Sequence, residues 1–264
     1  TNLSQAMSCI WVLAFLFGKR THLKIKKENL GLQAKIVLPS LALGCSTFVM
    51  QASESVISVC FNSSLLQYGG DIAVGAMTIL TSVMQFAMLP LQGLGQGAQP
   101  IISYNYGAGN VERVKAAFKL LLKASLCYSI LLWLFVMFFP QAFAAMFTSD
   151  ASLMEYTKTA LRIYMACLLL FGIQMACQMT FTSLGKAKAS ILVAVMRKFI
   201  LLIPLIYIMP TLFTSNQTMA VYMAEPVADF LAVSFTAILF TFQFKKVIAQ
   251  MTTSSSSKKE HVTI

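Results

Sequence analysis

The chain is built from apolar runs of the length that crosses a lipid bilayer. A bilayer core of about 30 Å needs about 20 consecutive apolar residues in a helix. One shorter run covers residues 3–17, and full-length runs follow, separated by short polar loops. The pattern predicts an all-α polytopic membrane protein. The full-length runs are residues 36–61, 72–102, 116–139, 156–181, 191–210 and 220–242.

The composition supports this prediction. Of the 264 residues, 58% are hydrophobic and 11% are charged, and the mean hydropathy is +0.74. Because a soluble domain carries about 25% charged residues, the composition excludes a soluble globule, a disordered chain and a nucleic-acid-binding module. The net charge of +11 has two remaining explanations. Basic loops bind anionic lipids or determine membrane topology, and we favour topology.

The basic residues alternate between the two sides of the predicted membrane. Lys158 and Arg162 fall on one side, and the other eighteen of the twenty Lys and Arg fall on the opposite side. Because basic loops stay in the cytoplasm, we expect a multi-pass protein of the cell (inner) membrane with a cytoplasmic C-terminus. The eighteen are Lys19, Arg20, Lys24, Lys26, Lys27, Lys35, Arg113, Lys115, Lys119, Lys123, Lys186, Lys188, Arg197, Lys198, Lys245, Lys246, Lys258 and Lys259.

Glu54 is the deepest acidic residue, near the middle of the run at 36–61. An ionisable group inside a span is costly unless it faces protein or water, which makes it a functional candidate. Gln51 and Ser58 extend a polar stripe along the same helix face. Since this pattern places no basic residue at the same depth, Glu54 is our first candidate for binding H⁺ or Na⁺. The alternative is a structural carboxylate that is hydrogen-bonded to neighbouring helices.

Glu225 and Asp229 lie four residues apart in the last run, with Pro226 between them. Like charges at this spacing repel, so one of them is protonated or both share a cation. They are our second candidates for cation coupling. The alternative is that Glu225 lies in a water-filled vestibule near the outer end of the helix.

Neutral amides provide candidate contacts to a substrate. Gln174 and Gln178 lie four residues apart in the run at 156–181, and Gln51 lies one turn before Glu54. Amides also join helices by hydrogen bonds, and that alternative stays open for each of them. The 16 Met and 20 Phe suit an adaptable pocket for lipophilic cations, although lipid contact and helix packing are the explanations that we favour.

The glycine-rich stretch Gly93–Lys115 predicts a hinge or a close helix approach, because it follows no strand and so is not a dinucleotide fingerprint. This stretch resembles the multidrug and toxic compound extrusion (MATE) family, and further motifs along the chain agree. One of these motifs comes just before a predicted helix, where Ser152 and Glu155 are expected to form a capping box. The motifs are Gly97-Ala98-Gln99-Pro100, Tyr104-Asn105-Tyr106-Gly107-Ala108-Gly109, Arg113-Val114-Lys115, Met146-Phe147-Thr148-Ser149-Asp150, Gly185-Lys186-Ala187-Lys188 and Ala224-Glu225-Pro226-Val227-Ala228-Asp229.

The resemblance implies twelve helices in two six-helix lobes. The chain, which starts inside an apolar run, is then expected to be part of a longer protein and to lack the first lobe. Residues 1–17 would end the sixth helix, 18–35 would form the cytoplasmic inter-lobe loop, 36–247 the C-terminal six-helix lobe, and 248–264 a disordered tail. In some members an acid on the seventh helix takes part in cation coupling, and Glu54 lies on the corresponding helix. Gln178 lies where some members place an acid on the tenth helix.

The function that this resemblance implies is secondary active efflux. Lipophilic organic cations or drugs would leave in exchange for H⁺ or Na⁺, with Na⁺ at Glu54 as one option and no other cofactor. The expected partners are the bilayer, the substrate and the N-terminal lobe, and no nucleic acid. The alternative within the superfamily is a flippase or exporter of lipid-linked or other non-drug substrates. A membrane enzyme would need a His, Asp and Glu cluster that the sequence lacks, and a channel would need a filter-like loop.

Overall fold

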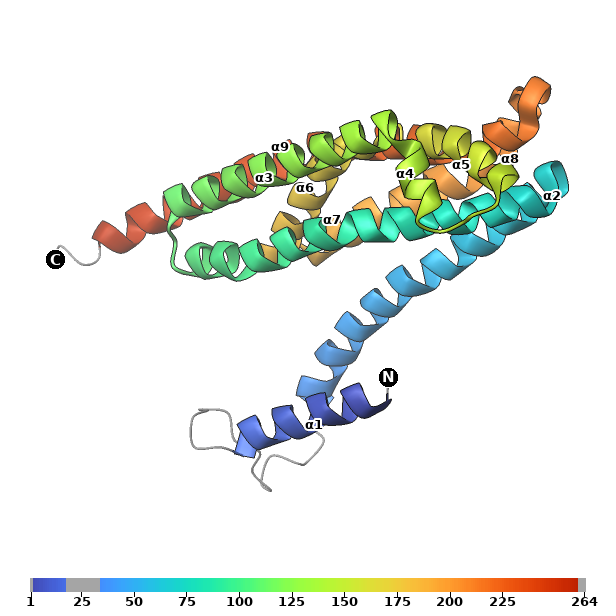
Figure 1. Cartoon of the computed structure of the whole chain (residues 1–264). Helices are drawn as coiled ribbons and strands as arrows, with labels where there is room; N and C mark the ends of the chain where they lie inside the picture. Colours follow the sequence, from blue (N-terminus) through green and yellow to red (C-terminus); the bar gives the residue numbers. More distant parts are fainter. Residues whose placement is uncertain (1, 18–33, 261–264) are drawn as a thin grey trace. The chain divides into compact units, whose positions relative to one another are not determined.

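The computed structural model describes residues 2–17 and 34–260, and the elements of this part are all helices, joined by short turns and loops, without a strand (Figure 1). The prediction of an all-α protein is therefore confirmed. The chain divides into two compact units, Thr1–Val49 and Met50–Ile264, each of which is described by itself.

The first unit holds the helix α1 (Asn2–Phe17) and the beginning of α2 (Ala34–Gly107). The apolar stretch of α1, Leu3–Leu16, is shorter than a membrane span, and its large side chains are exposed. Residues 18–33, which make up most of the predicted inter-lobe loop, lie outside the described residues.

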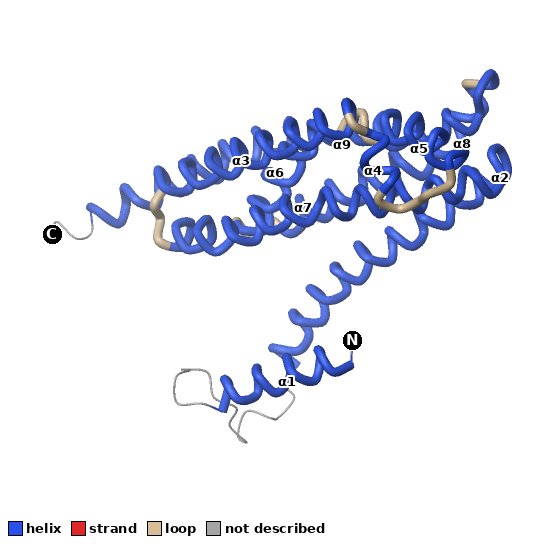
Figure 2. The backbone as a smooth tube through the Cα atoms, viewed as in Figure 1, coloured by secondary structure: helices blue, strands red, loops and turns tan. Residues whose placement is uncertain are grey.

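The second unit begins within α2, which has a first arm before Gly70 and a second arm after it, because the chain doubles back at this glycine (Figure 2). Gly70 has φ 65° and ψ −161°, a conformation that is essentially restricted to glycine. The second arm stays helical through Pro90 and Pro100 to Gly107. The predicted close approach is found at Gly95, where a Cβ atom would lie 2.6 Å from Cγ of Met179 on a neighbouring helix.

Four helices in the described part are long and apolar enough to cross a membrane, and a bent pair makes up to five. The first of the four contains the turn at Gly70 and so includes parts of two predicted runs. The bent pair is α5 with α6, at 44°. The remaining elements are α3 (Val111–Phe138), α4 (Pro140–Ala145), α5 (Ala151–Tyr164), η2 (Leu168–Leu170), α6 (Phe171–Ser183), α7 (Ala187–Val195), the π-helix η3 (Met196–Leu202), α8 (Ile203–Leu212), η4 (Thr214–Asn216) and α9 (Gln217–Glu260).

The helix α9 organises the packing of this unit, because it contacts α5, α6, α8 and η3. Tyr222 on α9 is fully buried and donates a hydrogen bond from its hydroxyl to the carbonyl of Ala73, at 2.7 Å. The sequence predicted a disordered tail from residue 248, whereas α9 continues to Glu260. Val247 and Met251, one turn apart, are buried against the ends of α2 and α3, and this packing keeps the helix intact there.

The helix α5 begins at an exposed acidic N-cap, and it differs from the predicted capping box. Asp150, rather than Ser152, is the N-cap, and Glu155 forms an ion pair with Lys158 instead of closing the box. The Asp150 carboxylate accepts hydrogen bonds from the Ser152 hydroxyl at 2.7 Å and from the backbone N–H groups of Ser152 and Leu153. These bonds lower the pKa of Asp150 below its ordinary value, the Ser152 hydroxyl having the largest effect.

Candidate functional site

Two acidic side chains are buried on α9. Glu225 is 5% exposed and Asp229 is 2% exposed, and their spacing of four residues places them on one face of the helix. The helix continues through Pro226 between them. The burial of both groups excludes the alternative that Glu225 lies in an open vestibule, and it requires that their charges be compensated.

Arg197, on the π-helix η3, supplies that compensation. Its Nε lies 2.6 Å from Oδ1 of Asp229, and its Nη2 lies 2.8 Å from Oε1 of Glu225. The guanidinium carbon also lies 5.0 Å from the centre of the Phe171 ring, at the start of α6. The sequence predicted that the two acids share a cation or hold a proton, and in the structure a guanidinium bridges them with charge-assisted hydrogen bonds.

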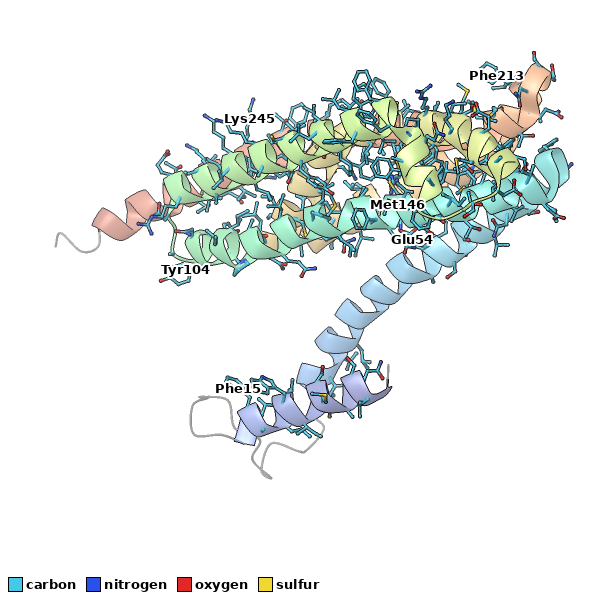
Figure 3. All side chains as sticks on the ribbon, in the orientation of Figure 1. Phe15, Glu54, Tyr104, Met146, Phe213 and Lys245 are labelled. Carbon is cyan, nitrogen blue, oxygen red and sulfur yellow. The ribbon has the colours of Figure 1, made fainter. Side chains whose placement is uncertain are left out.

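Lys198, the next residue, forms an ion pair with Glu54. Glu54, which is labelled in Figure 3, lies on the first arm of α2. The prediction that no basic residue lies at the depth of Glu54 is therefore wrong. Adjacent residues of a helix point in different directions, so Arg197 reaches α9 while Lys198 reaches α2. A π-helix is a rare element that occurs often at functional sites.

Sequence reasoning misplaced these two cations. The alternation of basic residues predicts Arg197 and Lys198 on the cytoplasmic side, whereas both lie inside the helix Lys188–Leu212, which is long and apolar enough to span a membrane. The signal was present, because both residues fall within the apolar run at 191–210. A cation inside such a run requires an acidic partner, and the three acids at membrane depth were the candidates.

The five charged groups form one cluster, defined here as Glu54, Arg197, Lys198, Glu225 and Asp229, whose members interact electrostatically. The cluster contains three carboxylates and two cations, so it has one carboxylate in excess. Exposure differs within it, since the Glu54 side chain is 61% exposed and that of Arg197 is 18% exposed. The cluster can therefore hold one proton or monovalent cation, and its Glu54 end is open.

A break in the membrane-spanning pair α5–α6 lies beside this cluster. The helix stops at Tyr164, a buried residue that interacts electrostatically with Glu225, Asp229 and Arg197. The indole Nε1 of Trp133 donates a hydrogen bond to the carbonyl that the break frees at Ala166, at 2.9 Å. Irregular backbone at membrane depth occurs where it is buried in protein or lines a cavity, and transporters build binding sites there.

The three glutamines predicted to contact a substrate differ in burial and in whether the structure describes their side chains. Gln174, one turn after Phe171 on α6, is 5% exposed, and its Oε1 has no hydrogen-bond partner within the described part of the chain. Gln178 is half-buried on the same helix. The side chain of Gln51 lies outside the described residues. A buried amide oxygen without a partner leaves Gln174 available to a ligand that carries a donor.

Comparison with known proteins identifies relatives of this chain. The MatE family model matches residues 46–208, which is more than half of the chain. The multidrug export protein MepA of Staphylococcus aureus (strain N315) is 26% identical over 192 residues, covering 73% of this chain and 41% of MepA. MepA of Staphylococcus haemolyticus is 22% identical over 233 residues, covering 88% of this chain and 51% of that protein. The chain thus spans about half the length of these relatives.

Solved structures share the fold. A MOP superfamily transporter from Pyrococcus furiosus superposes with a TM-score of 0.83 at 20% identity, covering 93% of this chain and 55% of that one. A multidrug resistance MATE family transporter in an outward-facing conformation gives a TM-score of 0.82 at 20% identity, with the same coverage. The apolar helices indicate a multi-pass membrane protein, and the matching family model shows that this chain belongs to the MatE family.

Proposed function

We propose that this chain forms one lobe of a secondary active exporter that releases lipophilic organic cations in exchange for H⁺ or Na⁺. The observation that carries the proposal is the excess carboxylate of the cluster. Arg197 balances only one of its two partners, Glu225 and Asp229, while Lys198 balances Glu54. A buried site with one uncompensated negative charge attracts a single cation, and exchange of that cation for a charged substrate is the chemistry of antiport.

The two ends of the cluster are proposed to have different roles. Glu225 and Asp229, which are buried, hold the exchangeable H⁺ or Na⁺ close to Arg197. Glu54, which is exposed and lies opposite Lys198, is the acid that the aqueous path and an organic cation can reach. The amides Gln174, Gln178 and Gln51 are the proposed polar contacts to the substrate. A cation that binds at Glu54 changes the net negative charge that Lys198 and Arg197 balance. Binding at Glu54 is thereby coupled to ion binding at Glu225 and Asp229.

The proposed setting follows from the family. A second lobe of the same fold would close the cavity, and rocking of one lobe against the other would expose the cavity to each side in turn. The lobe would reside in the cell membrane with its C-terminus in the cytoplasm, with the coupling ion as its only cofactor. Its proposed partners are the bilayer, the organic cation and the second lobe, and no nucleic acid.

A second candidate function is the export of a substrate other than a drug. The Pyrococcus furiosus relative has a binding pocket of reverse polarity, which suggests a different function for that protein. In this chain Arg197 and Lys198 place two cations inside the membrane span, next to Glu54. An anionic or lipid-linked substrate would pair with these cations if Glu54 were displaced from Lys198.

The test is efflux of a fluorescent organic cation from cells that express the gene product containing this chain, under an imposed H⁺ or Na⁺ gradient. We expect gradient-driven efflux in the wild type and at least about a tenfold loss in Glu54→Gln, because the accessible carboxylate is removed. Glu112→Gln is the matched control, since Glu112 is an exposed acid whose partner, Lys115, lies one turn away on the same helix.

The outcomes separate the candidates. Efflux that persists in Glu54→Gln at the wild-type rate, with both proteins present at equal levels, would contradict the role of Glu54. Absence of organic-cation efflux under either gradient, with uptake or release of an anionic substrate instead, would favour the second candidate function.

A further inference from the structure

A basic cavity lies at one end of the second unit, away from the charged cluster. Its volume is about 390 Å³, which is in the range of small-ligand sites. It opens between the start of α7 and the C-terminal part of α9. Figure 3 shows Lys245, which precedes the cavity residue Lys246, toward the end of the unit opposite Phe213. The residues that line the cavity are Lys186, Phe242, Gln243, Lys246, Val247 and Gln250.

The two lysines of this cavity differ from the two cations of the charged cluster. Within the described residues neither Lys186 nor Lys246 forms an ion pair, whereas Arg197 and Lys198 each bind a carboxylate. Lys186 is half-buried at the N-cap of α7, and Lys246 is exposed on α9. The amides of Gln243 and Gln250 add hydrogen-bond donors to the same wall. Two ammonium groups and two amides that face one cavity suit a phosphate group.

The position of the cavity along α9 indicates where that phosphate comes from. The apolar run at 220–242 ends at Phe242, and Lys246 follows one turn later, where a span of this length would reach the lipid headgroups. Phe242 is 71% exposed, so an apolar surface for an acyl chain adjoins the polar cavity. Basic cavities between membrane helices at this depth bind the headgroups of anionic lipids.

We propose that this cavity binds the phosphodiester headgroup of an anionic phospholipid, with Lys186 and Lys246 contacting the phosphate and Phe242 contacting the acyl chain. The site is independent of the transport function proposed above, because it shares no residue with the charged cluster. A bound lipid would join α7 to α9. The helix α7 leads into η3, which carries Arg197, and α9 itself carries Asp229.

The test uses the detergent-purified gene product that contains this chain, titrated with phosphatidylglycerol or phosphatidylcholine and examined by native mass spectrometry. We expect phosphatidylglycerol adducts in preference to phosphatidylcholine adducts. Lys186→Ala with Lys246→Ala is expected to weaken phosphatidylglycerol binding about thirtyfold, from two lost lysine contacts. Lys186→Arg with Lys246→Arg should retain the adducts, because the positive charges remain.

The matched control is Lys188→Ala with Lys245→Ala, which removes the same charge from two exposed lysines outside the cavity. Equal loss of lipid in both double alanine variants would overturn the proposal, since net charge alone would then explain binding. Competition with inorganic phosphate at millimolar concentration distinguishes a lipid headgroup from free phosphate as the ligand. If it displaces phosphatidylglycerol and the protein shows no preference for that lipid over phosphatidylcholine, the site takes free phosphate and the lipid assignment fails.

Discussion

The second unit uses its basic residues in two contrasting environments. In the middle of the membrane-spanning helices, Arg197 and Lys198 are largely buried, and each is paired with an acid from another helix. At the end of the unit, Lys186 and Lys246 face a cavity, and within the described part of the chain no acid is paired with either.

The difference teaches how a membrane protein separates structural from exchangeable charge. A buried cation must be compensated within the protein, because hydrocarbon cannot solvate it. A cation at the membrane boundary is compensated by water or by lipid phosphate. In our two proposals, the charge available for function is therefore the third carboxylate in the middle of the spans and the pair of lysines at the boundary.

The largest effect is expected from removing the buried cation. Arg197→Leu leaves Glu225 and Asp229 without a partner, and breaking a buried pair in this way costs about 3–5 kcal/mol of folding free energy. The measurement is the thermal stability and folded yield of the purified gene product. Lys115→Met is the matched control, because the Lys115–Glu112 pair is exposed, and its loss should cost less than about 1 kcal/mol.

A compensated variant sharpens this prediction. Arg197→Leu combined with Glu225→Gln and Asp229→Asn removes all three charges together, and we expect it to recover most of the lost stability without recovering coupled efflux. If the triple variant is as unstable as Arg197→Leu alone, the instability comes from lost packing of the Arg197 side chain, including its contact with Phe171, and the charge argument fails.

The smallest effect is expected from an acid that water already solvates. Hydrogen bonds lower the pKa of Asp150 below 3.8, so its ionised form stabilises the start of α5. This contribution is present above the pKa of the unfolded chain and is lost as the pH falls through the lower pKa of the folded chain. We expect Asp150→Asn to flatten the stability profile slightly between neutral pH and about pH 2.

The measurement is thermal unfolding of the unsubstituted protein and of Asp150→Asn in parallel across this pH range. Identical profiles would mean that the hydrogen bonds from Ser152 and Leu153 contribute nothing to stability. A steeper decline in the variant would reverse the sign of the predicted effect.

The sequence predicted the helical membrane fold, because apolar runs of span length allow few other structures. It also identified Glu54, Glu225 and Asp229 as the acids at membrane depth, since an acid within an apolar run is conspicuous. It did not predict how far the last helix extends, because the polar composition after residue 250 concealed the packing of Met251.

The pattern of apolar and charged residues alone does not predict which acid pairs with which cation. Arg197 lies 28 residues from Glu225 and Lys198 lies 144 residues from Glu54, so only the packed helices bring them together. These adjacent side chains reach different helices from a π-helix, and a π-helix has no characteristic amino-acid composition by which the sequence could predict it. The cavity between Lys186 and Lys246 likewise depends on how α7 and α9 pack, which hydropathy does not encode.

The most direct test of the central claim is the count of cations released when substrate binds. The purified gene product that contains this chain is mixed with an organic cation in weakly buffered solution, and H⁺ release is followed by a pH indicator and Na⁺ release by a selective electrode. If the excess carboxylate holds the exchangeable cation, about one cation is released per bound substrate, and Glu225→Gln, in which Arg197 would balance Asp229 alone, releases none. Substrate binding without any release, or equal release from Glu225→Gln, would contradict the central claim.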